Sequence, residues 1–407
     1  MEKDIKNSLT SSISLDSYIT DYMILQRNKK NIISGRTSSS TISLKFNDTI
    51  YYGKVKNKRF KIFLPKMEAS FDNTIVIYTN NSSIIINHVS IGEVILLSGQ
   101  SNAKWTLTHC NDTFKDEILS ANDDYLRLLD IKKNEKKKAS KKIVSDGWFC
   151  ANSNKIASFS ELGYFLGKRL RKELNIPIGI ICSAVGGTLA CYWMSKKSYK
   201  DLSKRVKIKE YFDKNESTPC LGFNGMIAPL KNISFRCVAF YQGESNATNC
   251  NYKEELSAII AGWRDYFNYQ IPFIIVELPR YKEIDYSSVR EAQQIVCQEK
   301  NKCYLAINID NGDPYNIHPT NKEILVDRIF KTFNGYLLGF KKPIYPTIRK
   351  IKKISNYTYR IEFSANGGNI IFKNGMNGFE CKVSNGTGFQ QFDAFVIDNN
   401  ASNWIDK

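Results

Sequence analysis

The chain has 407 residues, of which 42% are hydrophobic, so it can bury a substantial core and is not a disordered protein. Its formal net charge is +18, but the excess of Lys and Arg is spread along the chain, and only residues 132–142 form a dense basic run. No zinc-finger spacing and no RNA-binding strand motif accompanies that run. We therefore expect no nucleic-acid partner.

The cysteines and the N-terminus bear on the compartment. The ten cysteines are scattered without a CxxC pair, which favours small core residues in a reducing compartment over disulfides or a zinc site. Residues 1–16 are polar, unlike a signal peptide, and no stretch has the length and apolarity of a membrane span. As written, the sequence predicts a cytoplasmic protein; if a leader was removed, a secreted or periplasmic one is expected. It carries no signal for an oligomeric state.

The first part of the chain contains short strand-like runs separated by Asn, Gly, Lys and Ser. Examples are residues 41–46, 60–64 and 74–78. Closely spaced short strands of this kind predict a small β-sandwich. We place this N-terminal β domain at residues 1–91.

The pattern then changes to apolar runs alternating with longer amphipathic segments. The predicted strands are residues 94–97, 178–183, 237–241, 273–277 and 304–309, and the predicted helices are residues 160–173, 253–267, 287–299 and 322–338. Such alternation predicts a parallel sheet covered by helices on both faces, an α/β domain that we place at residues 92–342. From residue 345 to 404 the pattern is again β-like, which predicts a C-terminal β segment at residues 343–407.

A Gly-Gln-Ser-Asn segment, residues 99–102, follows the apolar strand at residues 94–97. Because ligands bind at the carboxyl ends of parallel strands, Ser101 is a candidate nucleophile. A serine needs a base to remove its proton, and the chain has three histidines. His318 is the candidate base, since it also lies on a predicted strand-to-helix loop, although it could instead simply cap that loop.

The other two histidines fit this role less well. His88 falls within a strand-like segment, where we expect a partly exposed sheet residue. His109 is close to Ser101 in the sequence but has no comparable loop setting. It remains an alternative as a base or a substrate contact.

Five segments together resemble the sialate O-acetylesterase family, a branch of the SGNH hydrolases. In chain order they are Ser-Gly-Gln-Ser-Asn at 98–102, Gly-Gly-Thr at 186–188, Asn-Gly-Met-Ile-Ala-Pro-Leu at 224–230, Tyr-Gln-Gly-Glu-Ser-Asn at 241–246 and Ile-His-Pro at 317–319. The resemblance implies a three-layer α/β/α SGNH-hydrolase domain flanked by β-sandwich-type segments. It also implies Ser101 as nucleophile and His318 as base, with no metal and no organic cofactor.

The resemblance further implies an oxyanion hole made by the Ser101 amide, Gly187 and a side chain of the 242–246 segment. Either Gln242 or Asn246 could be that donor, whereas Glu244 is expected to position neighbouring amides. The implied oxyanion and substrate-binding residues are Gln100, Asn102, Gly187, Gln242, Glu244 and Asn246.

The acid partner of His318 departs from the pattern. Many SGNH hydrolases carry Asp three residues before the histidine, but here that residue is Tyr315. We favour Asp313 as the partner, ahead of Asp310. Alternatively, a backbone carbonyl orients His318 and a Ser-His dyad operates.

These implications predict a serine esterase that removes O-acetyl groups from carbohydrates, with O-acetylated sialic acid as the favoured substrate. The alternatives are an esterase for xylan or another acetylated polysaccharide, and a carbohydrate-binding protein without activity. Trp105, Tyr192 and Trp193 lie beside the motifs, as either sugar-stacking or core residues.

Overall fold

The computed structural model describes residues 13–152, 155–206, 218–248, 250–337, 339, 345–355, 358–364, 380–382, 389–391, 394–398 and 402–405. The chain forms two compact units, residues 1–330 and 331–407, and each is described by itself. Among the described residues, no helix is long and apolar enough to cross a membrane.

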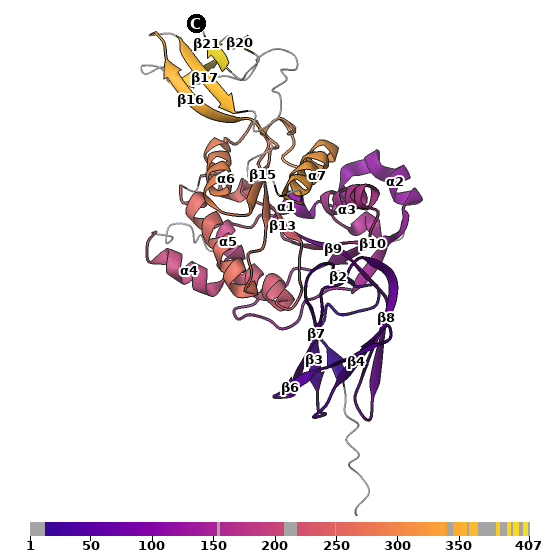
Figure 1. Cartoon of the computed structure of the whole chain (residues 1–407). Coiled ribbons are helices and arrows are strands. Elements are labelled where there is room, and N and C mark those ends of the chain that lie inside the picture. The colour runs from indigo at the N-terminus through magenta and orange to yellow at the C-terminus, as the bar shows by residue number, and fades with distance from the viewer. Residues whose placement is uncertain are drawn as a thin grey trace, which may run out of the picture. The chain divides into compact units, whose positions relative to one another are not determined.

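The first unit begins with the strands β1 (Ile13–Leu15), β2 (Ile24–Gln26), β3 (Asn31–Thr37), β4 (Ser43–Phe46), β5 (Thr49–Tyr52), β6 (Lys54–Lys56), β7 (Arg59–Leu64) and β8 (Ser70–Tyr78). One sheet has the order β1-β3-β7-β6, and β5-β4-β8 continue a second sheet (indigo in Figure 1). Along β7, Phe60, Ile62 and Leu64 are buried while the residues between them are more exposed, which is the period-two pattern of a half-buried strand. The predicted β-sandwich is confirmed.

The central sheet is built on β9 (Ser83–Gly99), a strand of 17 residues. Its first half pairs with β8 and β2, and its second half pairs with β12 and β13. The strand is therefore continuous across the predicted domain border between residues 91 and 92. The predicted strand at 94–97 is only part of the run of buried residues, 89–99, in β9.

The other strands of this sheet are β10 (Asn122–Asp130), β11 (Trp148–Asn152), β12 (Ile178–Ala184), β13 (Cys237–Tyr241), β14 (Phe273–Val276) and β15 (Cys303–Ala306). The order β10-β12-β9-β13-β14-β15 is parallel throughout, and β11 adds an antiparallel edge strand. The predicted parallel sheet is confirmed, with β10 and β11 as additions. In β10 the strand pattern is weakened by charged and polar residues, whereas β11 is a short strand of five residues.

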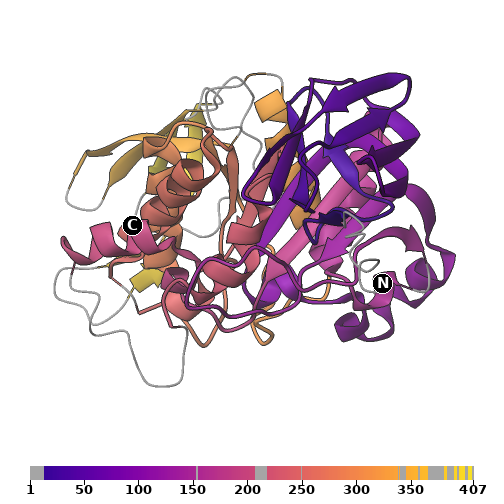
Figure 2. The ribbon, with the colours of Figure 1, turned by 90° about the horizontal axis from the view of Figure 1, so that it is seen from below.

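The helices are α1 (Ser101–Lys104), α2 (Lys115–Ser120), α3 (Glu161–Leu174), α4 (Lys196–Ser203), α5 (Tyr252–Phe267), α6 (Ser287–Glu299) and α7 (Glu323–Leu337), the last of which crosses the border between the two units. The helices α4, α5 and α6 lie to one side of the strands and α1 and α3 to the other, as Figures 1 and 2 show. The three-layer α/β/α arrangement is thereby confirmed, with all four predicted helices in place.

The second unit contains a four-stranded antiparallel sheet and a separate strand pair. The sheet has the order β16-β17-β21-β20, from β16 (Thr347–Lys353), β17 (Tyr359–Ser364), β20 (Ala394–Asp398) and β21 (Ser402–Ile405). The pair is β18 (Glu380–Lys382) with β19 (Phe389–Gln391). The β-like pattern after residue 345 is confirmed, whereas the predicted border at residues 342 and 343 lies outside the described residues.

A buried carboxylate fixes the amino end of the second half of β9. Glu93 has no exposed side-chain surface, and its oxygens accept hydrogen bonds from Arg27 (2.7 Å) and Arg236 (2.6 and 2.7 Å). Gln26 donates a further bond of 2.7 Å. Glu93 therefore ties the β2 segment and the segment that leads into β13 to the same strand.

Replacing Glu93 by Gln should lower the free energy of unfolding by about 3 kcal/mol, because two largely buried guanidinium groups lose their counter-charge. Urea denaturation measures this loss. Asp265→Asn is the matched control: it breaks the exposed pair with Lys197 and should leave the free energy of unfolding nearly unchanged. Equal losses for both variants would contradict this account.

Candidate active site

Three loops meet at the carboxyl end of the central sheet. In the parallel order, β9 lies between β12 and β13. The next parallel strand after β9 in the sequence is β10, on one side of β9, whereas the next after β12 is β13, on the other side. The strand order thus reverses at β9, and such a switch point leaves a crevice at the carboxyl ends of the strands. The segment 99–102 follows β9 at this edge of the sheet.

Gly99 allows Ser101 to emerge there. Its φ is +136°, and a Cβ atom at this position would lie 1.9 Å from the carbonyl oxygen of Tyr241. Only glycine permits both that conformation and that approach. The amide of Gln100 then donates to the same carbonyl at 3.0 Å, and Ser101 opens the short helix α1.

The loops after β9 and β13 are joined by buried amides. Gln100 Oε1 accepts hydrogen bonds from Gln242 Nε2 (3.2 Å) and from the backbone N–H of Gly243 (3.1 Å). Gln242 Nε2 also donates to the carbonyl of Thr188 (3.0 Å), on the loop after β12. A third acceptor of Gln242 Nε2 is Asn246 Oδ1 (2.7 Å). The side-chain amide of Gln242 therefore donates only to groups of the protein.

Asn246 is held in the same network. Its Oδ1 accepts from the amide of Ala190 at 3.0 Å, and its Nδ2 donates to Glu255 Oε2 at 3.2 Å. Gln100, Gln242 and Asn246 are each at most 2% exposed. In this structure the three side chains cross-link the loops around Ser101.

Gly187 lies on the loop after β12, beside the serine. Its φ is +71°, and no atom lies within 4 Å of an added Cβ position. A Cβ atom on its neighbour Gly186 would lie 3.4 Å from Ser101 Cβ. The structure therefore brings the Gly186–Gly187 turn against Ser101, with open space at Gly187.

Asn102 connects the serine loop to the histidine loop. Its Nδ2 donates to Glu244 Oε1 at 2.8 Å and to the carbonyl oxygen of Ile317 at 2.9 Å. Ser101 precedes Asn102 and His318 follows Ile317, so this one amide group ties the candidate nucleophile and base loops together. Glu244 is buried, and this burial raises its pKa to about 7.

The His318 ring stacks on Trp105, with ring centroids 3.9 Å apart and planes 13° apart. The half-buried imidazole has its pKa lowered by burial, by the charge of Lys322 and by His109. It is therefore neutral at neutral pH, the form that can accept a proton. In the described part of the chain, no carboxylate hydrogen bonds to this ring.

The two candidate acid partners point elsewhere. Asp313 is exposed, and its Oδ1 accepts from the amide of Tyr315 at 2.8 Å. Asp310 binds Arg328 through two hydrogen bonds of 2.5 and 2.8 Å. Asn316 Oδ1 accepts from the backbone N–H of His318 at 2.9 Å, so the polar groups of this loop shape its backbone.

A buried ion pair, which the sequence did not reveal, anchors the end of the histidine loop. Glu161, the first residue of α3, pairs with Lys322, and both side chains are at most 2% exposed. Lys322 Nζ also donates to the carbonyl of Pro319 at 2.8 Å. An acid after the capping Ser160 is typical of any helix start, so the sequence contained no signal for this role.

Of the other histidines and aromatic residues that the sequence suggested, some lie at the candidate site and others do not. His109 contacts the Trp105 ring (4.9 Å between centroids), whereas His88 is a part-exposed strand residue stacked on Tyr22. Tyr192 and Trp193 are at most 1% exposed and belong to the core. Trp105 is therefore the aromatic residue of this group that lies at the candidate site.

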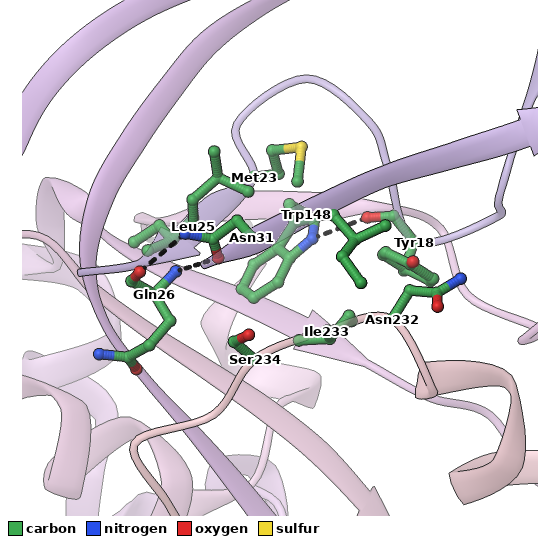
Figure 3. A pocket seen from close by; sticks show the side chains of 11 residues that line it. Tyr18, Met23, Leu25, Gln26, Asn31, Trp148, Asn232, Ile233 and Ser234 are labelled. Carbon is green, nitrogen blue, oxygen red and sulfur yellow. Dashed lines mark hydrogen bonds between the residues drawn. The ribbon is translucent and has the colours of Figure 1, made fainter. Parts of the chain in front are cut away.

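A separate pocket lies beside β2, which pairs with the middle of β9 at residues 90–92 (Figure 3). Its polar groups bind one another: Asn31 exchanges hydrogen bonds with the Gln26 backbone (2.9 and 3.1 Å), and Trp148 Nε1 donates to the Tyr18 carbonyl (3.0 Å). These bonds hold the sandwich against the sheet. Among the described residues, no group of His, Cys, Asp and Glu side chains could hold a metal ion.

The raised pKa of Glu244 makes a prediction about stability. Because the folded-state pKa is near 7 and the ordinary value is 4.5, the folded protein binds the proton more tightly, and stability falls as the pH rises from about 4.5 to 7. We expect wild-type protein to lose about 3 kcal/mol more than Glu244→Gln over this range. Urea denaturation at pH 4.5 and pH 8 measures the difference, and parallel pH curves would contradict the prediction.

The chain is similar to proteins of a known family. Residues 91–323 match the family described as carbohydrate esterase, sialic acid-specific acetylesterase. Rat sialate O-acetylesterase is 24% identical over 426 residues, covering 84% of this chain and 78% of the relative. The human enzyme of that name is 25% identical over 322 residues, covering 69% of this chain and 61% of the relative. The crystal structure of a carbohydrate acetylesterase from Xanthomonas citri shares the fold, with a TM-score of 0.87, 24% identity, and coverage of 97% of this chain and 91% of that one.

Proposed function

Because this chain belongs to the carbohydrate esterase family of sialic acid-specific acetylesterases, we propose that it hydrolyses O-acetyl esters of sialic acid through an acetyl-enzyme on Ser101. The observation that carries the assignment of residues is the Asn102 bridge. It binds Glu244 and the carbonyl of Ile317, and so joins the loops of Ser101 and His318 at one edge of the sheet.

In the proposed reaction, His318 takes the proton of Ser101 Oγ as the oxygen attacks the acetyl carbonyl carbon. The ester bond then breaks, the sugar hydroxyl leaves with the proton from His318, and an acetyl-serine remains. A water molecule, deprotonated by His318, then attacks the acetyl-serine. The bond between the acetyl carbon and Ser101 Oγ breaks, His318 returns the proton to Oγ, and acetate is released. The lowered pKa of His318 suits the first step, since the neutral imidazole is the base.

The negative charge that develops on the acetyl oxygen requires hydrogen-bond donors. We assign the backbone N–H groups of Ser101 and Gly187 to this role, supported by the closeness of the Gly186–Gly187 turn to Ser101. Gln242 is engaged by protein acceptors, so between the two side-chain candidates we favour Asn246, whose Nδ2 has a second hydrogen beyond the one given to Glu255.

The central test is acetate release from O-acetylated sialic acid, with acetylated xylan as the comparison substrate. Ser101→Ala and His318→Ala should each lower kcat by at least about 10³-fold, because the nucleophile or its base is lost. Circular dichroism confirms that the variants are folded. Full activity of Ser101→Ala would refute the nucleophile, and a preference for xylan would move the substrate to a neutral polysaccharide.

The exposed position of Asp313 leads us to favour a Ser-His dyad over the triad. Asp313→Asn should retain kcat within about threefold, since the amide oxygen can still accept the hydrogen bond from the Tyr315 backbone. The same acetate assay measures it. A loss of 10³-fold or more in a folded Asp313→Asn protein would show instead that Asp313 is the acid partner of His318.

A further inference from the structure

The base of the proposed dyad lacks a carboxylate but is covered by an aromatic face. In the described structure, the ring of His318 makes no hydrogen bond with an acid, and Asp313 and Asp310 bind other groups. The Trp105 ring lies parallel to the imidazole at 3.9 Å. A base without an acid partner still needs to be held in place and to have its positive charge stabilised when it takes the proton.

We propose that Trp105 is the positioning residue of His318, and that its aromatic face stabilises the imidazolium in place of the missing carboxylate. This inference rests on the proposed function. A cation over the face of an indole is attracted by the negative face of the ring, and Trp is the strongest of the aromatic residues in this respect. The parallel stack places the imidazole against that face.

The backbone of Trp105 is fixed to the nucleophile. Its amide donates to the carbonyl of Ser101 at 2.7 Å, and its own carbonyl accepts from the amide of Glu161 at 2.7 Å. The indole therefore stands one helical turn from Ser101 and is joined to the start of α3. Because the backbone amide and carbonyl of Trp105 are both hydrogen-bonded, its ring can act as a fixed platform for His318.

The charges around His318 explain why such a platform matters. Lys322 and His109 both oppose a positive charge on the imidazole, and burial opposes it as well. Glu161 pairs with Lys322 and so reduces the repulsion between Lys322 and a protonated His318. Asp313, on the loop of His318, is exposed and accepts a hydrogen bond from the Tyr315 backbone. Among these neighbours, the face of Trp105 is the group in direct contact that favours the imidazolium.

The same stack argues against Trp105 as a sugar platform. One face of the indole is covered by His318, and His109 contacts the ring at a tilt of 44° with centroids 4.9 Å apart. The test should therefore use a substrate without a sugar, 4-nitrophenyl acetate, on which a sugar-stacking role would have no effect.

The decisive comparison is between Trp105→Phe and Trp105→Leu, which both fill space but differ in having an aromatic face. Trp105→Phe should keep kcat within about threefold, and Trp105→Leu should lower kcat on the order of tenfold with KM unchanged. The acid limb of kcat/KM should move to lower pH in Trp105→Leu than in Trp105→Phe, since the imidazolium loses its stabilising face. Equal kcat values and equal pH profiles in the two variants would overturn the proposal.

A second measurement does not depend on turnover. The chain has three histidines, so NMR titration of the His318 ring is feasible, with His88→Gln and His109→Gln used to assign the signals. The pKa of His318 should be lower in Trp105→Leu than in Trp105→Phe, and identical titrations would overturn the proposal. If Trp105→Leu does not fold, Trp105→Met takes its place. Inactive wild-type protein would refute the proposed function, while the titration would still decide the role of Trp105.

Discussion

The hydrogen bonds of one side-chain amide hold the candidate site together. Asn102 Nδ2 has two hydrogens, and both are used: one binds the buried Glu244, and the other binds the carbonyl before His318. The serine and histidine loops come from strands more than 200 residues apart in the sequence, so their alignment depends on contacts between loops. Asn102 and Glu244 are both buried, so the bond between them is shielded from water.

The rest of the site follows the same physical logic. Gln100, Gln242 and Asn246 cross-link the loops after β9, β12 and β13, and the pair of Glu161 and Lys322 fixes the end of the histidine loop. Buried polar groups are costly unless they are paired, so a network of this kind specifies one arrangement of the loops. Electrostatic stabilisation of a transition state requires groups that are already in place before substrate binds, and loops fixed in this way meet that condition.

The sequence predicted the architecture well because the central strands are continuously apolar and the helices amphipathic. Strands such as β12 and β13 are buried on both faces, which leaves a clear signal, whereas β10 begins with Asn122 and two aspartates and was missed. At the candidate site, Ser101 and His318 were proposed from the loops on which they lie. The stack of Trp105 on His318 and the Glu161–Lys322 pair could not be predicted, because stacking and ion pairing between residues far apart in the sequence leave no local pattern.

The unbroken course of β9 has a mechanical consequence. The same strand is an element of the N-terminal sandwich at Ser83 and ends at Gly99, two residues before Ser101. A domain that moves as a lid needs a hinge, a few residues whose backbone angles can change. At the border with the central sheet, Ile91 of β9 pairs with Leu25 of β2 on one side and with Ser70 of β8 on the other, so the border itself supplies no hinge. The sandwich and the central sheet therefore share one strand, and the end of that strand at Gly99 is held in line with the sandwich.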